Sequence, residues 1–148
     1  MLAGTIVLAD CGTPAREKTN AAGSARVREI VITTVPLLTK ELATNYPFLK
    51  TDFATGGVLA VKEVYEFMPS TITAVEGDTL RLTFINPEDD AHSFVMEDLA
   101  VSIPGQAVTH ATYVAARAGI HDFVCAIPGH LPMMHGQLVV MRPEGMTR

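Results

Sequence analysis

The 148-residue sequence has no apolar run near the roughly 20 residues that a membrane-spanning helix requires. Basic residues are also few, with 11 Lys and Arg against 16 Asp and Glu, so the formal net charge is −5. Nucleic-acid binding depends on clustered Lys and Arg, and this balance argues against it. The acidic excess mildly favours basic partners. The length is most simply that of one domain, and the 48% hydrophobic content is enough for a core.

Cysteine is scarce, and the first of the two cysteines lies in an N-terminal segment of its own. An apolar stretch, Leu2 to Ala9, resembles a truncated export signal, and Leu8-Ala9-Asp10-Cys11 resembles a lipoprotein signal whose cysteine is lipidated. Asp10 stands where such signals have a small residue, so an unprocessed flexible end remains the alternative. We interpret residues 1–26 as a signal remnant or flexible tether of a periplasmic or exported protein, with Cys11 as a candidate lipid anchor.

The second cysteine opens the segment that carries most of the chemistry. Cys125, His130 and Met134 follow one another with C-x4-H-x3-M spacing, and His92 at the end of an alternating apolar run supplies a second imidazole. Two imidazoles, one thiolate and a weak thioether are the ligand set of a blue-copper electron-transfer site. Soft sulfur suits Cu(I) and imidazole suits Cu(II), so a mixed set needs little rearrangement when an electron moves. A disulfide to Cys11 would consume the thiolate, and we expect none.

Two neighbours compete for the fourth ligand position. Met133 could supply the thioether in place of Met134, although the loop length favours Met134. His135 could replace the thioether with a third imidazole, which would give a less blue and more tetragonal centre. The simpler interpretation of His135 is an exposed surface residue. The other two histidines, His110 and His121, have no ligand-like neighbours and are expected to face solvent.

Short apolar runs at intervals of about ten residues, with turn residues between them, predict an antiparallel sandwich or barrel. The expected strands are Val27–Thr34, Val58–Phe67, Thr71–Val75, Leu80–Ile85, His92–Met96, Ala107–Ala115, Ile120–Cys125 and Gly136–Met141. Between the first two, apolar residues over Val35–Phe53 approximate helical spacing, but Pro36 and Pro47 interrupt it. We expect a short helix or two turns there, covering one end of the sheet.

The pattern Cys125-x-x-Pro128-Gly129-His130-x-x-x-Met134-x-Gly136 resembles the copper loop of the cupredoxins, and that of azurin most closely. Phe67-Met68-Pro69 through Gly77-Asp78 to Asn86 also resembles their entry strands. The resemblance covers about Val58 to Met141. It implies an all-β, Greek-key β-sandwich that holds one type 1 copper at one end, through His92, Cys125, His130 and Met134.

The resemblance also suggests domain limits and excludes other branches of the family. We expect an N-terminal strand and partly helical extension over 27–57, the cupredoxin domain over 58–142 and a loose tail over 143–148. One cysteine in the loop excludes a binuclear copper centre, which needs two. Five histidines are too few for a copper nitrite reductase acting alone, and no His-x-His pair of a laccase-like oxidase is present.

Two positions near the ligands are expected to support them. Cupredoxins like azurin carry Asn after the first histidine ligand, and here Ser93 is expected to take over its link between the ligand loops. The backbone N–H groups of Ser93 and Ile127 are candidate donors to the Cys125 sulfur. The acidic run Glu88-Asp89-Asp90 is either a solvated loop or a contact for a basic partner or cation.

The expected function is that of a one-electron carrier rather than an enzyme, working in the bacterial cell envelope. Its redox partner would be a c-type cytochrome, an oxidase or a reductase. The alternative is a periplasmic copper-binding, delivery or resistance protein that uses the same ligands. In that case further soft donors would come from Met68, Met96, Met133 and His135. A metal-free structural sandwich is the third possibility.

Overall fold

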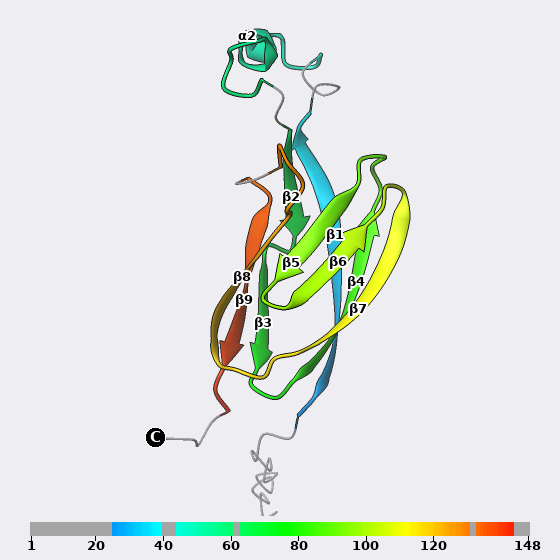
Figure 1. The fold of residues 1–148 in the computed structure, drawn as a ribbon, viewed down its shortest axis with the longest axis vertical. Helices are drawn as coiled ribbons and strands as arrows, with labels where there is room; N and C mark the ends of the chain where they lie inside the picture. Colours follow the sequence, from blue (N-terminus) through cyan, green and yellow to red (C-terminus); the bar gives the residue numbers. More distant parts are fainter. Residues whose placement is uncertain (1–24, 40–43, 61–62, 131–132, 144–148) are drawn as a thin grey trace, which may run out of the picture.

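The computed structural model describes residues 25–39, 44–60, 63–130 and 133–143. Within these ranges the strands form two sheets, one in the order β2-β1-β4-β7 and the other in the order β3-β9-β8-β5-β6 (Figure 1). The elements are β1 Val27–Leu38, η1 Pro47–Leu49, α2 Lys50–Phe53, β2 Val64–Met68, β3 Thr71–Val75, β4 Thr79–Asn86, β5 His92–Met96, β6 Leu99–Ile103, β7 Ala107–Val114, β8 Gly119–Val124 and β9 His135–Met141. The expected all-β sandwich is confirmed.

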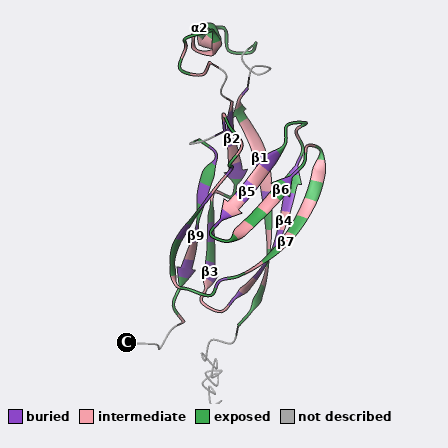
Figure 2. Cartoon of the chain, in the orientation of Figure 1, coloured by how far each residue is buried: buried purple, intermediate pink, exposed green. Residues whose placement is uncertain are grey.

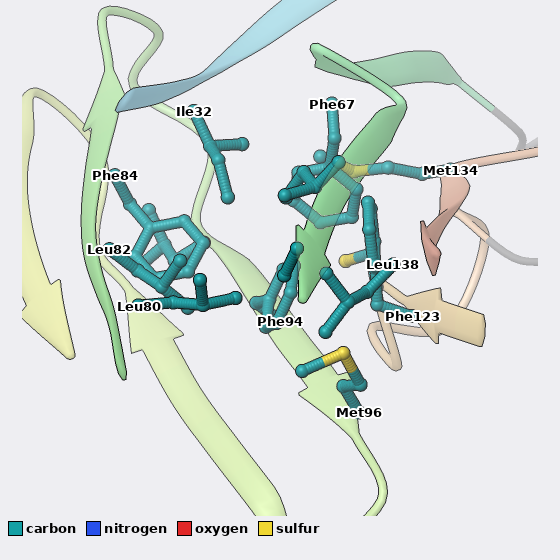
Figure 3. Packing of buried hydrophobic residues seen from close by; sticks show 14 of the residues in the cluster. Ile32, Phe67, Leu80, Leu82, Phe84, Phe94, Met96, Phe123, Met134 and Leu138 are labelled. Carbon is teal, nitrogen blue, oxygen red and sulfur yellow. The ribbon is translucent and has the colours of Figure 1, made fainter. Parts of the chain in front are cut away.

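The core lies between the inner faces of the two sheets. Burial alternates along β4, where Leu80, Leu82 and Phe84 are buried and the residues between them are more exposed (Figure 2). From the other sheet, the ring of Phe94 lies 4.9 Å from that of Phe84 and 4.7 Å from that of Phe123. Figure 3 shows Phe94 between Phe84 and Phe123. The period-two alternation read from the sequence therefore places the core correctly.

The first strand runs further than expected, to Leu38 instead of Thr34. Its first part, up to Thr33, pairs in parallel with β4, and its last part pairs antiparallel with β2. Pro36 lies in the last part, beyond the end of the β4 pairing, so its missing N–H removes no bond to that strand. Because β1 lies between β2 and β4 and contributes the buried Ile32, it is part of the sandwich.

The segment between β1 and β2 differs from its prediction. The expected strand Val58–Phe67 is wrong at its start, because Val58 to Ala60 form turns and β2 begins at Val64. The Leu59 N–H donates to the Asp52 carbonyl instead of to a neighbouring strand. Among the described residues of this segment, the helical part is confined to η1 and α2, neither of which contains a buried residue. This short extension lies beyond the end of the sandwich where β1 ends and β2 begins (Figures 1 and 2).

The strand β6 was not predicted. It forms a hairpin with β5, and the pairing ends at Met96 and Leu99, so only Glu97 and Asp98 make the turn. Glu97 takes a left-handed conformation, with φ +51°. Glycine or asparagine commonly marks such a turn in a sequence, and neither is present here, so the signal for a hairpin is missing.

The N-terminal segment with Cys11 and the last tail residues lie outside the described residues. Among the helices that the structure describes, none is long and apolar enough to cross a membrane.

Candidate metal centre

Three of the predicted donors meet at one end of the sandwich. His92 begins β5, Cys125 follows β8, and His130 lies in the loop that leads to β9. Their ligand atoms all lie within 4.8 Å of one another, and all three side chains are buried. The Nδ1 atom of His130 lies 3.3 Å from Nδ1 of His92 and 3.5 Å from the Cys125 sulfur. His92 and Cys125, which are 33 positions apart in the sequence, thus form one compact donor group with His130.

Backbone hydrogen bonds shape the loop that carries Cys125 and His130. The Cys125 N–H donates to the Met134 carbonyl at 2.9 Å and closes the loop at its base. Within it, the His130 N–H donates to the Ile127 carbonyl and the Met134 N–H donates to the His130 carbonyl. Gly129 has φ +93°, a left-handed conformation that glycine adopts without strain. This turn brings the His130 side chain back toward Cys125.

Asn86 holds the segment that precedes His92. This buried side chain donates to the carbonyls of Asp90 at 2.7 Å and Pro104 at 3.1 Å, and its own carbonyl accepts a bond from the Thr34 hydroxyl. Buried amides of this kind fix a loop because each polar atom needs its partner. The acidic segment before His92 is therefore anchored to the sandwich at Asp90.

Ser93 links the two ligand segments. Its backbone N–H points at the Cys125 sulfur at 3.4 Å, and its hydroxyl lies 3.8 Å from the same atom. The hydroxyl oxygen also accepts a bond from the Ala126 N–H at 2.9 Å. A donor to the sulfur stabilises thiolate charge and orients the ligand. The hydrogen bonds of the described residues include no matching bond from the second expected donor, the Ile127 N–H.

The two methionines of the loop have opposite environments. Met134 is fully buried and extends into the core cluster toward Phe67 (Figure 3), whereas Met133 is 50% exposed. His135 is exposed at the start of β9 and does not belong to the donor group. Burial therefore favours Met134 over its two neighbours as the fourth ligand, although core packing alone would also bury it.

Burial keeps both imidazoles uncharged near neutral pH. Desolvation, helped by the neighbouring His130, lowers the pKa of His92 to about 4 despite the opposing charge of Asp90. Desolvation also lowers the pKa of His130, against the charges of Asp90 and Glu63. Metal binding requires neutral imidazole, so the site needs no proton release from these rings at pH 7.

The residues present fit a copper ion. Two ring nitrogens that face each other at 3.3 Å share at most one proton, so at least one lone pair points into the space between His92 and His130. The thiolate-forming Cys125 lies beside that space, and the three donors combine soft sulfur with imidazole nitrogen. Such a set suits copper.

Tyr65, which was not predicted from the sequence, lies against both imidazoles. Its ring centroid is 4.6 Å from that of His92 and 4.8 Å from that of His130. Burial, together with the nearby carboxylates of Asp90 and Glu63, raises the pKa of Tyr65, so the phenol stays protonated. The only signal in the sequence was its place two residues before Phe67, on the same face of β2.

The two histidines expected to face solvent differ from each other. His110 is exposed on β7, as predicted. The prediction is wrong for His121, which is buried and has both ring nitrogens 2.8 Å from oxygen atoms, one of Glu97 and one of the Arg117 backbone. The hairpin turn at Glu97 brings the carboxylate there, and that turn was not predicted.

Solved structures with the same fold include a blue copper protein, a copper nitrite reductase and a multi-copper oxidase. Auracyanin A, a blue copper protein from the green thermophilic photosynthetic bacterium Chloroflexus aurantiacus, matches with a TM-score of 0.51 and 17% identity over 77% of this chain and 98% of that chain. A copper nitrite reductase from Nitrosomonas europaea matches with a TM-score of 0.57 and 15% identity, over 82% of this chain. This chain spans only 45% of that enzyme's length. A multi-copper oxidase from Pseudomonas thermotolerans matches with a TM-score of 0.53 and 16% identity, over 82% of this chain and 31% of the oxidase.

At these identities the structural matches show the fold alone. No curated protein matches the sequence. The comparison with protein families is decisive, because residues 38–140 match the cupredoxin-like domain. That range includes all four predicted ligands and eight of the strands described above, β2 to β9. The chain therefore belongs to the cupredoxin family.

Proposed function

We propose that this protein is a mononuclear type 1 copper electron carrier, with the metal held by His92, Cys125, His130 and Met134. The observation that supports this most is the convergence of one buried thiol and two buried imidazoles within 4.8 Å. Bound copper would supply the one-electron couple between Cu(I) and Cu(II). The protein's contribution is to hold the donors in place whichever oxidation state is present.

The rigidity of the donor set supports a carrier. Cys125 is tied to Met134 and Ser93 through backbone bonds, and His92 begins β5, which lies between β8 and β6 in its sheet. Donors that are held this way cannot move far to satisfy either oxidation state, which keeps the reorganisation small. The burial of the three donors leaves little access for a substrate, and we therefore propose a non-enzymatic role.

His130 is the candidate route to the surface. Its relative exposure is 8%, against 1% for His92 and 0% for Cys125. Met133, three residues further along the loop, is half exposed and would form part of the docking rim. Leu131 and Pro132, which were expected to share that rim, lie outside the described residues. A small apolar rim suits transient redox complexes, which bury little surface and separate quickly.

The proposed setting is the bacterial cell envelope, with a c-type cytochrome, an oxidase or a reductase as the redox partner. The export-like segment before residue 27 supports this location, and Cys11 is the candidate lipid anchor. Fractionation of cells that express the full chain, followed by mass determination of the mature protein, tests both points.

Copper loading tests the function directly. The carrier should bind one copper per chain tightly and show an intense visible thiolate-to-Cu(II) charge-transfer band. Its one-electron reduction should be reversible. A delivery protein should instead exchange copper readily with a chelator or bind more than one. Of the extra soft donors considered for delivery, Met96 lies in the core and is unavailable at the surface. An intense visible band from bound copper would exclude a metal-free structural sandwich.

Met134→Leu is expected to keep a blue site with a raised reduction potential. Removing a weak donor disfavours Cu(II) more than Cu(I), and Leu fills nearly the same volume in the core, so stability should change by less than about 1.5 kcal/mol. Potentiometry and visible spectra are the measurements. Met133→Leu is the matched control and should leave both unchanged. If Met133→Leu shifts the potential and Met134→Leu does not, the axial ligand is Met133.

Met133→Glu is expected to slow electron exchange without moving the potential or the visible spectrum. The side chain is half exposed and is not one of the proposed ligands, so a carboxylate there should oppose the close apolar contact of two carriers. The electron self-exchange rate, measured by NMR line broadening in mixtures of the two oxidation states, reports this directly. Met141→Glu is the control, since Met141 is equally exposed at the far end of β9. Equal rates in both variants would place the electron route on another face.

A further inference from the structure

Three aromatic rings form a cluster at the metal end of the sandwich. The centroids of Tyr65, His92 and His130 lie between 4.6 and 5.0 Å from one another. The Tyr65 ring meets His92 edge to face, with an interplanar angle of 69°, and His130 at 45°. Each imidazole can rotate about its Cβ–Cγ bond, and a third ring packed against both limits that rotation. The plane of each candidate ligand therefore depends on Tyr65.

Two carboxylates hold the tyrosine from its other end. The hydroxyl group donates toward the Asp90 carboxylate at 2.5 Å and toward the Glu63 carboxylate at 3.1 Å. Asp90 precedes His92 by two residues, in the segment that Asn86 anchors, and Glu63 lies just before β2. Tyr65 itself is buried. The hydroxyl thus joins β2 to the loop that carries the first histidine, and hydrogen bonds to charged acceptors are the stronger kind.

We propose that Tyr65 is a positioning residue for the metal centre. The Tyr65 ring fixes the planes of the two imidazoles, and the Tyr65 hydroxyl group holds the ring in position. This rests on the proposed function, because it takes His92 and His130 as copper ligands. Without this constraint the imidazoles would gain freedom to rotate, and the ligand set would suit Cu(II) better than it does in the wild type. That change would stabilise Cu(II) and weaken its interaction with the Cys125 thiolate.

Tyr65→Phe is the main test, since it keeps the ring and removes only the hydroxyl. The expected results are a weaker thiolate band, a wider copper hyperfine splitting in the EPR spectrum and a lower potential. Release of copper to a chelator should become faster, on the order of tenfold, as for other residues that orient metal ligands. Tyr65→Leu, which also removes the ring, should show larger changes of the same sign.

Tyr113→Phe is the matched control. Its hydroxyl also donates to a carboxylate, that of Glu97 at 2.8 Å, but it lies outside the ring cluster and the donor group. The same loss of a phenol–carboxylate bond there should leave the spectrum, the potential and the copper release rate at their wild-type values. A general loss of stability would affect both variants alike.

A measurement on the metal-free protein completes the test. The ring resonances of His92 and His130 in NMR spectra should be sharp in the wild type and broadened or doubled in Tyr65→Phe, because the rings exchange between orientations. A Tyr65→Phe variant with wild-type spectra, potential and copper release overturns the proposal. If the wild-type protein itself forms no thiolate band with copper, the proposed function fails instead, and the two failures are thereby distinguished.

Discussion

Replacing Cys125 with serine is expected to abolish the visible thiolate-to-copper band and electron exchange while leaving a folded domain. Only a thiolate couples strongly and covalently to copper, and a serine hydroxyl does not ionise near neutral pH. The side chain is fully buried, so the smaller and more polar hydroxyl should destabilise the metal-free protein by about 1–3 kcal/mol. Ser93, whose N–H points at the sulfur, offers the new hydroxyl a partner.

The measurements are visible and EPR spectra after copper loading, and thermal unfolding of the metal-free protein. Cys11→Ser is the matched control, because it makes the same chemical change in the N-terminal segment and should leave the band intact. A band that survives Cys125→Ser would place the copper site elsewhere and contradict the proposed ligand set. Copper that still binds without the band would be held by the remaining proposed ligands, His92, His130 and Met134.

Replacing Gly136 with alanine is expected to lower the free energy of unfolding by about 2–3 kcal/mol. A β-carbon at this position would lie 2.3 Å from the Phe123 ring and 2.4 Å from the Ser70 carbonyl oxygen, so both the core ring and the backbone would have to move. Phe123 lies two residues before Cys125 and Gly136 two residues after Met134. The displacement should therefore reach the ligand loop and alter the visible band as well.

Denaturant unfolding of the metal-free protein measures the change in stability. Gly56→Ala is the control: nothing lies within 4 Å of its added carbon, but its φ of +88° gives a backbone penalty of about 1–2 kcal/mol. The Gly136 variant should be the less stable of the two, because the clash lies in the core. A Gly136→Ala protein as stable as the wild type would show that the contact of β9 with Phe123 can relax freely.

The ligand chemistry and the sandwich could be predicted because both depend on short-range patterns. Cys125 and His130 occupy one loop, so their spacing alone predicted that a thiol and an imidazole would meet. The alternation along β4 follows from the two-residue period of a strand with one buried face. Where a short segment carries its own signal, sequence analysis placed the element within a residue or two, as for β3 and β5.

Only the tertiary structure decided which distant side chains meet. Tyr65 and Asp90 are 25 residues apart, and their bond exists because the β4–β5 loop packs beside β2. The burial of His121 likewise depends on a hairpin turn at Glu97 that has no sequence signal. Apolar residues over Val58 to Ala60 looked like a strand, yet they form turns. Local periodicity determines which face of a strand is buried, but contacts between loops depend on how whole sheets pack, which no short pattern encodes.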